Sequence, residues 1–73
     1  MVTYEIQGRR TARGPDGKPR EVVRLAAAAD RAAAFAIADS MAADRLTVWV
    51  FARERRSDAG SAYTLLATIT ATP

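Results

Sequence analysis

Hydrophobic and polar side chains alternate along the first residues of the chain. Val2, Tyr4 and Ile6 are separated by single polar residues, and most of residues 2–9 are compatible with β-structure. A period of two places the apolar side chains on one side of an extended backbone. This pattern predicts a half-buried strand over residues 2–9.

A cluster of turn residues follows between residues 10 and 19. Pro15 presets φ for a turn, and Gly17 can supply the positive φ that closes it. We therefore expect a hairpin with a long basic loop. The chain should return as a shorter strand over residues 20–25, with Val23 and Leu25 on the inner side.

Alanine, the residue with the highest helix propensity, dominates residues 26–44. Asp30 is the expected N-cap, because its carboxylate can accept the free amide hydrogens of a first turn. An apolar stripe recurs at spacings of three and four at Ala34, Ile37, Ala38 and Met41. The pattern predicts one amphipathic helix of about fourteen residues, close to the usual length.

Residues 46–53 are apolar on both sides of an extended backbone, which is typical of a central strand. Val48 and Val50 lie on one side, and Trp49 and Phe51 on the other. The polar residues 54–61, with Asp58 and Gly60, predict a second hairpin turn. Residues 63–71 alternate again; this strand is expected to turn Tyr63, Leu65, Ala67 and Ile69 inward and Leu66 outward.

These elements predict a single α+β domain over residues 1–73. Its sheet is four-stranded and mainly antiparallel, with one helix on one face and the order β-β-α-β-β. One helix can cover only one face of such a sheet. The other face must therefore meet water or a partner.

The composition excludes most catalytic chemistry. The 73 residues are 49% hydrophobic and 26% charged, as in ordinary globular proteins, and they include no cysteine and no histidine. Disulfides, thiol nucleophiles and the commonest general base and zinc ligands are thereby excluded. No acid–base pair with an orienting partner is visible. We expect neither an enzyme nor a protein with a cofactor or metal site.

No run approaches the ~20 apolar residues that a membrane span needs. The alternating first residues also differ from a signal peptide, which has an apolar block after a basic start. We therefore expect a cytoplasmic protein.

The first candidate site lies on the uncovered sheet face and consists of Trp49, Phe51 and Leu66. Large apolar groups there would lose favourable burial unless a partner covers them. We expect this face to bind a protein or to form a homodimer. The alternative is that Trp49 fills the core beneath the helix. Base stacking on these aromatic residues is also conceivable, but the glycine-rich context of RNA-recognition sheets is absent.

The second candidate site is the basic hairpin, with Arg9, Arg10, Arg13, Lys18 and Arg20. Arginine forks suit phosphate and carboxylate. The alternative is a solvated turn whose charges keep the protein soluble. A second group, Arg53, Arg55 and Arg56, should lie at the opposite end of the sheet, so that the two groups form no common groove.

The predicted layout has Thr3-Tyr4-Glu5-Ile6-Gln7 in its first strand, the helix start at Asp30-Arg31-Ala32 and Thr47-Val48-Trp49-Val50 in its central strand. On these residues the layout resembles that of small phage-encoded anti-CRISPR proteins of the type I-F kind. The resemblance implies binding to a ribonucleoprotein complex. The leading hypothesis is therefore a non-enzymatic protein that docks on a larger protein or ribonucleoprotein. The alternative is a nucleic-acid-binding module that uses the basic hairpin.

Overall fold

The computed structural model describes residues 1–56 and 60–71. The elements follow one another as β1 (Val2–Arg13), β2 (Pro19–Ala28), α1 (Arg31–Ala43), β3 (Thr47–Arg56) and β4 (Gly60–Ile69). The expected α+β class and the order β-β-α-β-β are thus confirmed. All paired strands are antiparallel, and the sheet order is β2-β1-β3-β4.

The strands are longer than the sequence pattern indicated. The first two extend to Arg13 and start at Pro19, so the expected loop shrinks to five residues, 14–18. The Gly17 amide donates to the Gly14 carbonyl at 3.0 Å, and Gly17 has the expected positive φ of 78°. The second turn was expected to contain Asp58, which lies outside the described residues.

Helix α1 starts and ends at recognisable capping motifs. The Asp30 carboxylate accepts a hydrogen bond from the Ala33 amide at 2.8 Å, which confirms the expected N-cap. At the other end, the Arg45 amide donates to the Ala42 carbonyl and the Leu46 amide to the Met41 carbonyl. Arg45 has a φ of 68°. This pattern is a Schellman motif, which turns the chain directly into β3.

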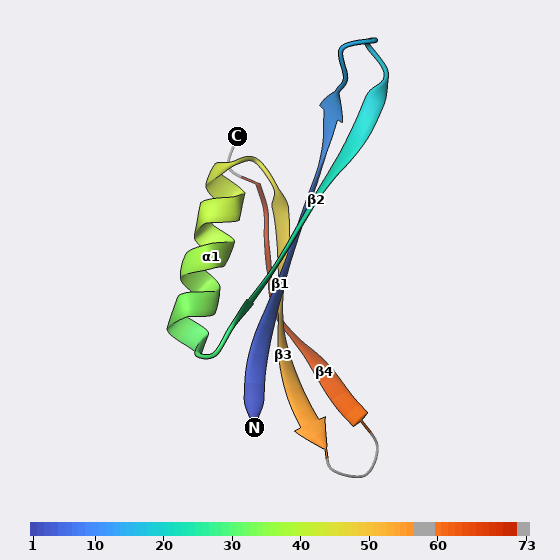
Figure 1. Cartoon of the computed structure of the whole chain (residues 1–73). Coiled ribbons are helices and arrows are strands. Elements are labelled where there is room, and N and C mark those ends of the chain that lie inside the picture. The colour runs from blue at the N-terminus through green and yellow to red at the C-terminus, as the bar shows by residue number, and fades with distance from the viewer. Residues whose placement is uncertain (57–59, 72–73) are drawn as a thin grey trace.

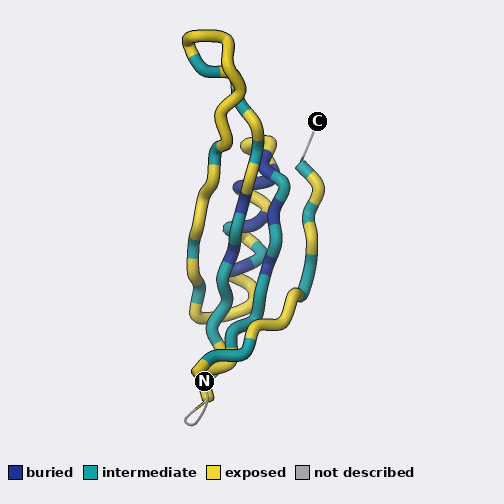
Figure 2. The backbone as a smooth tube through the Cα atoms, turned by 90° about the vertical axis from the view of Figure 1, so that its right-hand side faces the viewer, coloured by how far each residue is buried: buried dark blue, intermediate teal, exposed yellow. Residues whose placement is uncertain are grey.

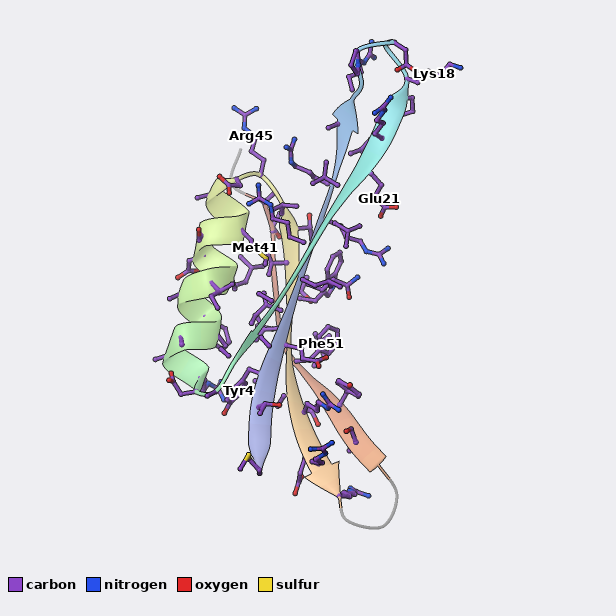
Figure 3. The ribbon with its side chains drawn as sticks, viewed as in Figure 1. Tyr4, Lys18, Glu21, Met41, Arg45 and Phe51 are labelled. Carbon is purple, nitrogen blue, oxygen red and sulfur yellow. The ribbon has the colours of Figure 1, made fainter. Side chains whose placement is uncertain are left out.

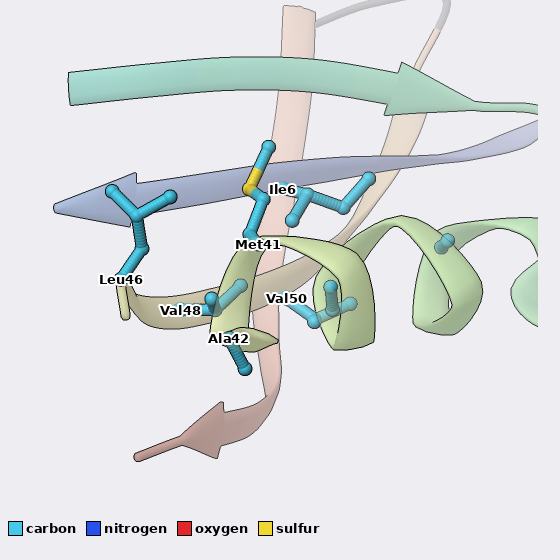
Figure 4. Packing of buried hydrophobic residues seen from close by; sticks show 8 residues of the cluster. Ile6, Met41, Ala42, Leu46, Val48 and Val50 are labelled. Carbon is cyan, nitrogen blue, oxygen red and sulfur yellow. The ribbon is translucent and has the colours of Figure 1, made fainter. Parts of the chain in front are cut away.

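The core lies between α1 and the two central strands. Figure 2 shows the buried segments along β1 and β3, with those of the helix behind them. Side chains from the sheet and the helix meet there in one cluster, seen closely in Figure 4. Its buried members are Ile6, Ala34, Ala38, Met41, Ala42, Leu46, Val48 and Val50.

Gly8 allows the helix to approach the sheet closely. A Cβ atom at this position would lie 3.0 Å from Met41 Sδ and 3.3 Å from Leu46 Cβ. Both distances are shorter than ordinary van der Waals contact. The missing side chain on β1 therefore provides the space that the C-terminal turn of α1 and Leu46, just before β3, occupy.

The expected facing of β2 was wrong. Val23 and Leu25 were expected to face the core, but they are 45% and 75% exposed. The register pairs Ile6 with Ala26 and Gln7 with Leu25, which places Leu25 on the side away from the helix. The side chains of β2 that pack toward the core are instead the smaller Val22, Ala26 and Ala28.

The expected facing of β4 was correct for only part of the strand. Ala67 pairs with Val50, but Leu65 pairs with Phe51, so Leu66 is an extra residue in a β-bulge. Because of this extra residue, the side chains of β4 before Leu66 face the opposite way from the direction that the alternation after Leu66 predicts. Leu66, expected on the uncovered face, packs against the core cluster, whereas Tyr63 and Leu65 lie on the uncovered face.

The molecule is elongated because the β1–β2 hairpin projects beyond the rest of the sheet (Figure 1). Pairing between β1 and β3 ends at Arg9 and Thr47, whereas pairing with β2 continues to Arg13 and Pro19. The radius of gyration is 14.2 Å, against about 11 Å for a compact domain of this length. Within the described residues, no helix is long and apolar enough to cross a membrane.

Candidate functional site

The sheet face opposite α1, here called the open face, is covered by no other part of the described chain (Figure 2). The strand pairing brings together on it side chains from all four strands. Its apolar members are Val23, Leu25, Ala27, Trp49, Phe51, Tyr63 and Leu65. Two of the three residues predicted for this face, Trp49 and Phe51, therefore lie on it, and Leu66 does not.

Leu25, Tyr63 and Leu65 were missed as members of the open face. They are among its most exposed large side chains, at 75%, 54% and 52%. Trp49 and Phe51 are half-buried. Figure 3 shows Phe51 pointing away from the helix, on the side opposite Met41. An exposed apolar group that extends across a sheet in this way is typical of a protein-binding surface.

A hollow of about 630 Å³ crosses the open face. The hollow follows β1, whose Glu5 and Gln7 lie between apolar residues of the neighbouring strands, with Leu25 and Ala27 on one side and Phe51 and Tyr63 on the other. A polar stripe thus divides the apolar surface. Any molecule that fills the hollow must combine apolar contacts with groups that hydrogen-bond to the Glu5 carboxylate and the Gln7 amide.

Arg53 orders one end of the open face. Its Nε donates to Ser61 Oγ at 2.9 Å, and its Nη1 lies 3.4 Å from Glu5 Oε1. The guanidinium is also 5.8 Å from the centre of the Tyr63 ring, within the range of a cation–π contact. These contacts connect β1, β3 and β4 and hold Tyr63 in place beside the hollow. Arg53 was expected in a basic cluster, and it acts here as an internal contact.

The second candidate site is the β1–β2 hairpin from residue 9 to residue 21, here called the arm. All five predicted basic residues lie on it, and Figure 3 shows Lys18 at its tip. Its pairing places Arg10 and Arg20 on the helix side and Arg9 and Arg13 on the side of the open face. The cations are therefore distributed over both sides of a two-stranded ribbon.

The arm cations differ in their local partners. Arg9 Nη1 lies 3.4 Å from Glu21 Oε1, and the Gln7 amide oxygen, when turned toward Arg9, accepts from Nη2 at 2.9 Å. Within residues 1–56 and 60–71, none of the other four (Arg10, Arg13, Lys18, Arg20) forms an ion pair. Arg13, Lys18 and Arg20 are exposed, and Arg10 is half-buried.

The two basic groups lie at opposite ends of the sheet, as expected. The Arg55 amide donates to the Met1 carbonyl at 3.3 Å, so that end of β3 adjoins the start of the chain. The tip of the arm is at the far end of β1 (Figure 1). The arm and the group of Arg53, Arg55 and Arg56 therefore form no continuous groove.

The described residues contain no group of three or more acidic side chains that could hold a metal ion. Arg24 lies on the helix side of β2 and forms an ion pair with Asp44 at the C-cap of α1, at 2.6 Å. Comparison of the chain with protein-family models, with curated proteins and with solved structures found no match.

Proposed function

We propose that this protein is a non-enzymatic interaction protein that docks on a larger protein or ribonucleoprotein through its open face. The observation that carries the proposal is the exposure of Leu25, Tyr63 and Leu65 beside Trp49 and Phe51. Covering a leucine side chain fully on binding is worth about 1.5–3 kcal/mol. An uncovered surface of this kind is costly in water, and a protein partner would remove the cost.

The geometry of the hollow supports a protein as the occupant. Interface centres combine aromatic and aliphatic side chains with few charges. The open face has this composition on both sides of the hollow. The carboxylate that lines the hollow, that of Glu5, is already contacted by Arg53 at 3.4 Å. A partner with an apolar ridge would cover the apolar side chains of the hollow, and one or two hydrogen-bond donors on that ridge would pair with the polar groups between them.

Docking through a surface is also the mode of action that the resemblance to anti-CRISPR proteins implies. That resemblance rests on the β-β-α-β-β layout, and such a protein would act by occupying a surface of a ribonucleoprotein. A phage-derived inhibitor of this kind is therefore one form that the proposed function could take. The protein would need no catalytic group for that role, since occupation of the surface is itself the inhibitory event.

The test compares three immobilised proteins in lysate of the native host: the wild type, Leu25→Ser/Leu65→Ser and Val2→Ser. Val2 is a matched control, because it is 44% exposed but lies at the end of β1 and outside the hollow. We expect a protein or ribonucleoprotein that the wild type and the control retain and the double variant loses. Loss of two leucine side chains that the partner would cover should weaken binding about 100-fold or more.

Thermal unfolding of the three proteins is measured in parallel. Exposed leucines contribute little to folding, so the melting temperatures should agree closely. If the double variant retains the same partners as the wild type, the open face is not the docking surface and the proposal is wrong.

A further inference from the structure

The net charge of the chain is located entirely on the arm. The arm carries five cationic side chains and the two carboxylates of Asp16 and Glu21, which makes +3. The formal charge of the whole chain is also +3, so the other residues sum to zero. The excess positive charge therefore lies on one projecting hairpin, at the opposite end of the sheet from Arg55 and Arg56.

The shape of the arm makes these charges accessible from both sides. Beyond Arg9 the ribbon is only two strands wide, because β3 pairs with β1 no further than that residue. The tip is held by hydrogen bonds from the Gly14 amide to the Lys18 carbonyl at 2.9 Å and from the Lys18 amide to Asp16 Oδ1 at 3.1 Å. These hydrogen bonds close the loop and hold the two charged strands of the arm side by side.

We infer that the arm binds nucleic acid through the phosphate backbone, and that duplex DNA is the form it fits. A two-stranded ribbon can enter the major groove of B-DNA, whereas the major groove of an RNA duplex is too narrow for it. The long cationic side chains of such a ribbon lie within reach of the phosphates that border the groove. Contacts to phosphate alone carry no base sequence, so binding is independent of sequence.

The number of available cations sets the salt dependence. Arg10, Arg13, Lys18 and Arg20 have no ion-pair partner in the part of the chain that is described. Four phosphate contacts give a slope of log K against log salt of about −3.6. Affinity should therefore fall about 150-fold between 50 and 200 mM salt.

The experiment is a fluorescence-anisotropy titration of a labelled 20-base-pair duplex of mixed sequence over this salt range. The test variant is Arg13→Ala/Arg20→Ala, in which two exposed arm cations are lost. The matched control is Arg55→Ala/Arg56→Ala, which removes the same charge from the opposite end of the sheet. We expect the test variant to halve the slope to about −1.8, and the control to keep the wild-type slope.

The outcomes separate this inference from the docking proposal. Leu25→Ser/Leu65→Ser should bind the duplex as the wild type does, because the open face and the arm are different surfaces. The inference is overturned if no duplex binds at 50 mM salt, or if both arginine variants reduce the slope equally. It is also overturned if the protein prefers a polyglutamate chain or an RNA duplex to DNA, since the arm would then serve a different class of partner.

Discussion

At the scale of single residues, the ends of α1 depend on two side chains and one backbone conformation. Asp30 satisfies the free amide of Ala33, and Arg45 adopts the left-handed conformation that lets the chain leave the helix. Alanine propensity alone would allow this helix to extend in either direction. The caps therefore determine where it starts and ends, and so which side chains face the sheet.

Replacing Asp30 by alanine should reduce the free energy of unfolding by about 1 kcal/mol, within the usual range for an N-cap. Asp30→Ser should retain nearly all of the stability, because a hydroxyl can accept the same hydrogen bond. Urea unfolding followed by circular dichroism measures both. Equal losses in the two variants would mean that the cap hydrogen bond does not stabilise the helix.

At the scale of elements, the contact between α1 and the sheet depends on small side chains. Alanines on the helix and Gly8 on β1 bring the two layers close, with Leu46 and Met41 above the glycine. The interior of a protein is packed as densely as an organic crystal, so a methyl group added here has no free space.

Gly8→Ala should therefore destabilise the protein by about 1–3 kcal/mol, the usual cost of overpacking. The added methyl would have to displace Met41 Sδ at 3.0 Å and Leu46 Cβ at 3.3 Å. Met41→Ala should itself cost about 2–5 kcal/mol, because it leaves a cavity in the core. Gly8→Ala combined with Met41→Ala should nevertheless lose less than the sum of the two single losses, because the added methyl then occupies space that the Met41 side chain has left. Denaturant unfolding of both variants checks this, and an unchanged stability of Gly8→Ala would contradict the close packing.

At the scale of the whole molecule, the two proposed surfaces are separate. The open face lies on the broad side of the sheet, and the arm projects beyond its end in a molecule 48 Å long and 15 Å thick. A single protein could therefore contact a protein through the sheet and a nucleic acid through the arm. A protein–DNA complex would present both kinds of surface together.

Self-association through the open face is not expected. The apolar residues of that face are divided by Glu5 and Gln7 of β1, and a second copy would bring these groups toward their own copies. We expect sedimentation to give a 7.9 kDa monomer between 5 and 200 µM. Trp49 emission should be unchanged over this range. A dimer whose formation shifts Trp49 to shorter wavelength would instead make a second copy the occupant of the face.

The candidate sites were predicted in part. The sequence placed the basic residues of the arm on one hairpin, through the loop signals around Gly14 and Gly17, and the structure has them there. The open face was predicted through Trp49 and Phe51 but without Leu25. The register that pairs Gln7 with Leu25 follows from a five-residue loop, 14–18, in which the Gly14 amide donates to the Lys18 carbonyl. A four-residue loop would have shifted the register by one residue and turned Leu25 inward, so the turn residues alone do not determine the facing of Leu25.

The amino-acid sequence by itself determined the order of the elements, the N-cap at Asp30 and the absence of cysteine and histidine chemistry. These depend on local propensity and on composition. Only the tertiary structure decided the facing of β4, because the bulge at Leu66 arises from pairing with β3, a strand already covered by the helix. A shift of one residue exchanges the two faces of a strand, and alternation within the strand itself does not specify where such a shift occurs.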